Sequence, residues 1–207
     1  QMTSALGVQG YALLLDCRTL EIEPVPLPST VAIVVMDTGI RRQLAASEYN
    51  VRREQCEQAV WLLGKHLTGV RALRDVEVED LGRLRAYLPE ILYRRVRHVV
   101  TENWRVLRAA EALRQGDPAT VGALMTAGHL SLRDDYGVSA PELDALVKAA
   151  GQVKGCYGAR LTGAGFGGCV VALVTAEALP DFEAHVSASY QETFGRQPVI
   201  HFCHSSD

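Results

Sequence analysis

The densest run of glycine in this chain lies immediately before an uninterrupted apolar segment. Together the two segments limit how residues 163–175 can fold. Gly163, Gly165, Gly167 and Gly168 fall within six residues, and the segment 169–175 reads Cys-Val-Val-Ala-Leu-Val-Thr. Glycine at this density is unfavourable unless the backbone needs positive φ angles or approaches another group closely. A continuous β-branched run is typical of a buried strand. The sequence therefore predicts a loop without bulky side chains that leads directly into a β-strand.

The glycine spacing also matches the Gly-x-Gly-x-x-Gly fingerprint of dinucleotide-binding folds. That fingerprint requires a strand before the glycines and a helix directly after them. A strand follows here instead, so we reject the dinucleotide interpretation. Two interpretations remain: a loop whose N–H groups face an anion such as a phosphate, and a tight turn in a β-hairpin.

The order of predicted strands and helices indicates an α+β protein. Strand-like segments come first, at 11–17, 21–27 and 30–36. Helices are predicted next, at 47–67, 78–88, 90–115, 117–133 and from 139 onwards, with Ser47, Asp117 and Ser139 as N-caps. The remainder alternates between the two types, with strands at 157–161, 169–175 and 199–203 and a helix at 179–194. This order predicts an α/β sandwich of ferredoxin-like character.

Charge and cysteine usage exclude several classes of protein. A formal net charge of −3 gives no electrostatic reason to expect nucleic acid or an anionic membrane as a partner. No apolar run approaches the roughly 18–20 residues of a membrane span. The five cysteines are scattered and contain no Cys-x-x-Cys pair, so neither a disulfide framework nor a zinc site is indicated. We expect a cytoplasmic protein.

A few polar side chains are candidates for chemistry. His201 and His204 have the spacing of metal ligands but no nearby acidic cluster, so they are weak candidates. His129 is expected to be packed or hydrogen-bonded within the fold. The segment 133–136, Arg-Asp-Asp-Tyr, offers paired carboxylates, for which we favour ion pairing over metal binding. Tyr49, in the first turn of a predicted helix after a loop, is placed to offer its hydroxyl to a polar ligand.

Five segments together resemble the galactokinases, sugar kinases of the GHMP family. The matching segments are 12–18, 47–56, 97–103, 131–136 and 160–169, and they occur in the family's order over almost the whole chain. The last of them is similar to the third GHMP motif, and the segment 47–56 is similar to a motif characteristic of galactokinases. Ala164 stands where that third motif often has glycine, which is a small departure.

The resemblance implies a fold, a reaction and roles for particular residues. Residues 38–207 would form a GHMP kinase C-terminal domain, and residues 1–37 would be the last strands of the N-terminal kinase domain. The reaction would transfer the γ-phosphate of ATP to the C1 hydroxyl of galactose, with Mg²⁺. Tyr49 would hydrogen-bond the sugar. Gly163, Gly165, Gly167 and Gly168 would line the active site near the transferred phosphate.

The resemblance also places the family's catalytic groups upstream of Gln1. These groups are a catalytic aspartate, a sugar-binding arginine, a serine-rich ATP loop and the Mg²⁺ ligands. The chain is therefore expected to hold no catalytic residue and no metal ligand, to be inactive alone, and to be monomeric when intact. Alternatives are an N-acetylgalactosamine or other hexose kinase of this family, and a non-catalytic sugar sensor that regulates transcription through a partner protein.

Overall fold

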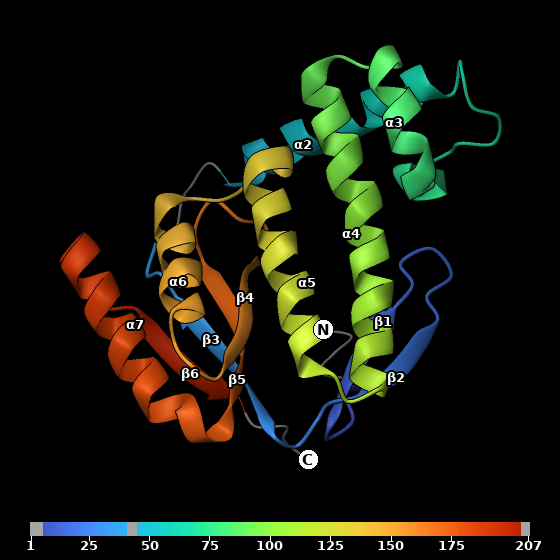
Figure 1. The fold of residues 1–207 in the computed structure, drawn as a ribbon. Helices are drawn as coiled ribbons and strands as arrows, with labels where there is room; N and C mark the ends of the chain where they lie inside the picture. Colours follow the sequence, from blue (N-terminus) through green and yellow to red (C-terminus); the bar gives the residue numbers. More distant parts are fainter. Residues whose placement is uncertain (1–5, 41–44, 204–207) are drawn as a thin grey trace.

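The computed structural model describes residues 6–40 and 45–203, and contains two antiparallel sheets flanked by helices (Figure 1). The smaller sheet pairs β1 (Tyr11–Leu15) with β2 (Ile22–Pro26). The larger sheet has the order β4-β5-β3-β6, formed by β3 (Val31–Asp37), β4 (Cys156–Thr162), β5 (Cys169–Thr175) and β6 (Val199–Cys203). All of its neighbouring strands are antiparallel.

Among the described residues there are five longer helices, which are α2 (Ala45–Leu63), α4 (Glu90–Arg114), α5 (Pro118–Ser131), α6 (Pro141–Gly151) and α7 (Leu179–Phe194). Of these, α4, α5, α6 and α7 pack on the larger sheet, and α2 packs against α4 beyond it. Short helical turns lie between α2 and α4, namely η1 (Leu73–Asp75), η2 (Val78–Asp80), α3 (Leu81–Leu84) and η3 (Arg85–Tyr87). A π-helical turn, η4 (Leu132–Tyr136), follows α5, and η5 (Ala176–Ala178) precedes α7. Across the described residues, no helix combines the length and apolar character that a membrane-spanning segment requires.

Helices cover both faces of the larger sheet: α6 and α7 cover one face, as a ferredoxin-like sandwich requires, and α4 and α5 cover the other. The alternating burial along β3 turns Val34 and Met36 towards the main core, which α6 and α7 complete. Ile33 lies on the opposite face, where it packs with residues of α4 and α5. Numbered by their order in the chain, the four strands lie across the sheet as fourth, first, third, second. Helices lie in both crossover connections, from β3 to β4 and from β5 to β6. The predicted α+β sandwich is confirmed.

A second core lies away from the sheet, where α2 and α4 pack against the short turns between them. Its buried residues include Leu63 from α2, Leu84 from α3 and Val96 from α4, each with no exposed surface. In Figure 1 this group of helices stands at the end of α4 remote from β1 and β2. The long helix α4 therefore connects the helical core with the sheet.

The structure corrects several local expectations. The predicted helix at 78–88 is a series of short turns rather than one helix. The N-cap of α6 is Ala140, one residue later than predicted, and Ser139 donates its hydroxyl hydrogen bond to Asp144 instead. Helix α2 begins at Ala45, so Ser47 lies within the helix rather than before its first residue, as was predicted. Asp117 does cap α5, because its side chain accepts from the N–H of Thr120.

The position of β3 bears on where the chain divides into domains. The sequence-based division after residue 37 leaves β3 in the first unit, yet β3 is an inner strand that pairs with both β5 and β6. In the part of the chain that the structure describes, β1 and β2 form a sheet separate from the later strands. We propose that the boundary lies between β2 and β3.

Candidate functional site

The glycine loop between β4 and β5 has a backbone that few other sequences can adopt. Gly163, Gly165, Gly167 and Gly168 all have positive φ angles, of +81°, +80°, +139° and +83°. Phe166, inside the run, also has a positive φ of 62°, which is uncommon for a residue with a side chain. The density of glycine in the sequence therefore reflects a real conformational requirement.

Hydrogen bonds fix this loop to segments distant in the sequence. On one side, the N–H of Phe166 donates to the carbonyl of Val138 over 2.7 Å. On the other, the N–H of Gly168 donates to the carbonyl of Ile40, and the Gly168 carbonyl accepts from both the N–H and the hydroxyl of Thr38. The hydroxyl of the buried Tyr190, from α7, donates to the Thr38 carbonyl in turn. The loop is held in place from two directions.

Arg52 joins the first half of α2 to the same structure. Its Nε donates to the carbonyl of Tyr136 over 2.8 Å, and its Nη2 donates to the carbonyl of Gly137 over 2.9 Å. The guanidinium group also lies over the ring of Phe166, 5.7 Å from the ring centre. Arg52 therefore links α2, the π-helical turn η4 and the glycine loop.

Tyr49 precedes Arg52 by three residues, so the two side chains lie on neighbouring turns of the same side of α2. The Tyr49 side chain is 54% exposed and is thus accessible to a ligand. The structure brings the Tyr49 end of α2 close to the glycine loop through Arg52. That Tyr49 and the four glycines bind sugar and phosphate stays a prediction.

The acidic pair in η4 is committed to arginines. Asp134 forms an ion pair with Arg133 over 2.8 Å, and Asp135, which is buried, pairs with Arg97. The Asp135 carbonyl accepts a hydrogen bond from Arg95. Within the part of the chain that the structure describes, no three His, Cys, Asp or Glu side chains gather closely enough to hold a metal ion. The structural interpretation of the paired carboxylates is the one that the geometry favours.

The histidines considered as candidates for chemistry lie in different parts of the chain. His129 is buried, its Nδ1 accepts from the N–H of Leu161, and its Nε2 lies 3.1 Å from a carboxylate oxygen of Asp144. These contacts confirm a packed, hydrogen-bonded role, and burial lowers the pKa of His129. His201 lies on β6, whereas His204 lies outside the described residues.

A second buried histidine makes the stability of this region dependent on pH. His98 is 5% exposed, contacts the hydroxyl of Ser131 through Nδ1, and stacks on the Tyr136 ring. Burial lowers the pKa of His98 to about 4, from 6.5. Because the folded-state pKa is depressed, the neutral ring favours folding above pH 6.5, and this contribution is lost as the pH falls towards 4.

We expect the free energy of unfolding to fall by about 2 kcal/mol more between pH 7 and pH 5 in the natural chain than in a His98→Gln variant. Urea unfolding of both proteins at the two pH values measures this difference. Carboxylates with lowered pKa titrate at lower pH and act alike in both proteins. If the free energy of unfolding falls equally in both proteins between pH 7 and pH 5, burial does not lower the pKa of His98.

The sequence did not reveal the roles of two residues that hold the candidate site in place, Arg52 and Gly137. Arg52 was part of a matched motif but had no assigned role, and Gly137 was not singled out. Gly137 has a φ of +68° and closes the π-helical turn, so a glycine shortly after a helix was the available signal. The role of Arg52 had no local signal, because its acceptors lie more than eighty positions away.

Comparisons with known proteins agree with these motifs. A family model described as GHMP kinases C terminal matches residues 109–192. A galactokinase of Roseiflexus sp. (strain RS-1) is 49% identical over 207 residues, which is 100% of this chain and 53% of that protein. A galactokinase of Homo sapiens is 45% identical over 208 residues, covering 100% of this chain and 51% of the relative. The chain spans about half the length of the curated relatives it matches.

Solved structures show the same similarity in three dimensions. The structure of Lactococcus lactis galactokinase complexed with galactose has a TM-score of 0.93 and 34% identity, covering 99% of this chain and 53% of that one. The L. major mevalonate kinase in complex with R-mevalonate has a TM-score of 0.59, covers 95% of this chain and 49% of that one, and is 23% identical, which shows a shared fold alone.

Proposed function

Because this chain belongs to the galactokinases of the GHMP kinase family, we propose that it is part of an enzyme that transfers the γ-phosphate of ATP to the C1 hydroxyl of galactose. The observation that carries the proposal is the glycine loop, fixed beside the Tyr49 end of α2, in a chain 49% identical to a galactokinase along its whole length. We propose a cytoplasmic location and a monomeric state for the intact enzyme.

The glycine loop suits a role beside a phosphate. Phosphoryl transfer depends on positioning the groups and on stabilising charge around the transferred phosphate. Among the described residues, the N–H groups of Ala164 and Gly165 donate to no protein acceptor, while those of Phe166 and Gly168 hold the loop in place. Unoccupied N–H groups in a run of unusual φ angles form a concave donor surface that favours anions. In this proposal the loop contributes such donors.

The Mg²⁺ that a kinase of this kind uses does not fit the described side chains of this chain. The paired carboxylates of η4 are already bound to Arg133 and Arg97, and no other group of ligands gathers. We therefore assign no residue here to the metal and derive no step through it. The catalytic aspartate, the sugar-binding arginine and the ATP loop remain expected in the upstream part of the intact enzyme.

A chimera tests this proposal. The upstream part of the Roseiflexus galactokinase, up to the region matched here, is joined to Gln1, and ADP formation is followed with galactose, N-acetylgalactosamine and other hexoses. We expect turnover with galactose from the chimera and none from the 207-residue chain alone. Preference for another sugar would support the alternative hexose kinase, and sugar binding by a folded chimera without turnover would support the sensor.

Tyr49→Phe in the active chimera removes only a hydroxyl. If that hydroxyl binds the sugar, we expect the KM for galactose to rise about five- to tenfold, since a net hydrogen bond contributes about 1 kcal/mol. The KM for ATP should stay unchanged. Tyr87→Phe is the matched control, because Tyr87 is similarly exposed but lies in η3. An unchanged galactose KM in the Tyr49 variant would remove Tyr49 from the sugar site.

A further inference from the structure

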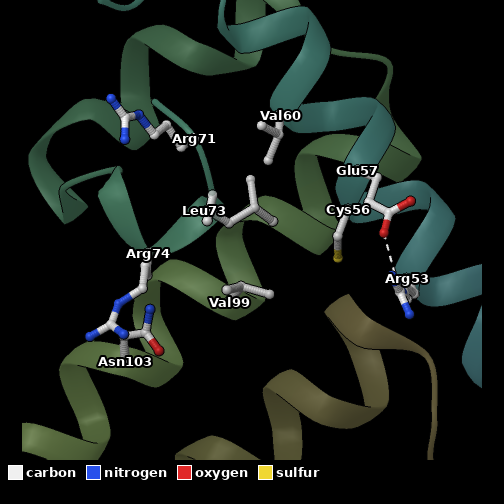
Figure 2. A pocket seen from close by; sticks show the side chains of 10 residues that line it. Arg53, Cys56, Glu57, Val60, Arg71, Leu73, Arg74, Val99 and Asn103 are labelled. Atoms are coloured by element: carbon white, nitrogen blue, oxygen red, sulfur yellow. Dashed lines mark hydrogen bonds and ion pairs between the residues drawn. The ribbon is translucent and has the colours of Figure 1, made fainter. Parts of the chain in front are cut away.

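A pocket of about 440 Å³ lies between α2, η1 and α4, and neither Tyr49 nor the glycine loop lines it (Figure 2). Its volume falls in the range of sites that hold small organic molecules. From α2 it receives side chains at positions 53, 56, 57 and 60, which lie along one side of the helix. It is thus a separate cavity built on the same helix as the candidate site.

The floor of this pocket is apolar. Cys56, Val60, Leu73 and Val99 converge on it from three different elements, as Figure 2 shows. Leu73 is 5% exposed and belongs to the helical core, and burial raises the pKa of the Cys56 thiol, which keeps that thiol neutral. Such a floor favours an apolar ring or alkyl group because water released from it gains freedom. It offers little to the hydroxyl groups of a sugar.

The rim of the pocket carries an excess of positive charge. Arg53 stands on one side of the floor, and Arg71 and Arg74 stand on the other (Figure 2). Arg53 is paired with Glu57 over 2.8 Å, and Arg74 with Asp16 over 2.6 Å. The Arg71 guanidinium forms no ion pair with any carboxylate among the described residues, and the Asn103 amide adds a neutral donor to the rim.

We propose that this pocket binds a small organic anion with an apolar body, such as an aromatic carboxylate or sulfonate. The apolar body would cover the floor, and the anionic group would meet the positive rim at Arg71, since Arg74 already binds Asp16. A ligand of this class differs from both the sugar and the nucleotide expected at the candidate site. The proposal therefore stands or falls independently of the kinase activity.

The probe for the test is 8-anilinonaphthalene-1-sulfonate, which combines aromatic rings with one sulfonate and becomes fluorescent in apolar sites. We expect saturable binding at one site on the full chain. Arg71→Glu should weaken binding about tenfold or more, since it replaces an attractive charge by a repulsive one, whereas Arg71→Lys should retain most of the affinity. Lys154→Glu makes the same change of charge at an exposed residue outside the pocket and should leave the affinity unchanged.

Two further measurements locate the bound probe. Val99→Phe, which fills the floor, should weaken binding several-fold. The probe should also slow alkylation of Cys56 by N-ethylmaleimide several-fold, with no effect on the exposed Cys203, as mass spectrometry of the two peptides would show. The proposal is overturned if Arg71→Glu binds the probe as tightly as the natural chain, or if Cys56 reacts equally fast with and without it.

Discussion

Replacing Gly165 by alanine is expected to lower the free energy of unfolding by about 3 kcal/mol or more. The φ of +80° at Gly165 disfavours any residue with a Cβ by about 1 kcal/mol. A Cβ built at this position would also lie 2.2 Å from the carbonyl oxygen of Val138. The loop would have to move away, which would break the hydrogen bond from Phe166 to that same carbonyl.

Gly163→Ala is the matched control for this prediction. Gly163 has nearly the same φ, +81°, but a Cβ there would meet no atom within 4 Å. Only the cost of a positive φ for a residue with a Cβ remains, so we expect the free energy of unfolding to fall by about 1 kcal/mol. Urea unfolding of the two variants separates the effect of backbone conformation from that of close contact. Equal losses would mean that the loop is not held tightly against Val138.

Gly158→Ala is expected to have an effect of similar size, at the contact between α5 and β4. A Cβ on Gly158 would lie 2.0 Å from the carbonyl oxygen of Gly122, and a Cβ on Gly122 would lie 2.1 Å from the carbonyl oxygen of Tyr157. The two backbones touch because neither residue has a side chain. Alanine would force the helix off the strand, and we expect the free energy of unfolding to fall by about 3 kcal/mol.

The control for this contact is Gly151→Ala, at the end of α6. Nothing lies within 4 Å of a Cβ there, and its φ is not in the left-handed region. We expect a change of less than about 1 kcal/mol, in the stabilising direction. Thermal unfolding followed by circular dichroism compares the two variants. If the Gly158→Ala variant unfolds at the same temperature as the natural chain, the backbones of α5 and β4 do not approach each other as closely as described here.

Local patterns were sufficient to predict most of the secondary structure. The β-branched runs became β3 and β5, Asp117 capped α5, and each of the four glycines adopted a positive φ angle. These features depend on residues close in sequence, and each has a direct conformational cause. The sandwich followed from the order of the elements alone.

What was not predicted depends on contacts between distant residues. No local signal shows that β3 pairs with both β5 and β6, since its partners lie more than 120 positions later. Arg52 likewise binds backbone carbonyls of η4 and Gly137 that its own neighbourhood does not reveal. The pocket between α2, η1 and α4 is lined by three segments that are separated in the sequence, so no single sequence motif marks it.

The most direct test of the account is the identity of the product. ³¹P NMR of the chimera incubated with galactose, ATP and Mg²⁺ should show a new phosphate monoester, with coupling to the hydrogen on C1 of galactose. Its formation should require the chimera and should not occur with the 207-residue chain alone. A folded chimera that forms no phosphorylated sugar, or that phosphorylates a different hydroxyl group, would contradict the proposed function.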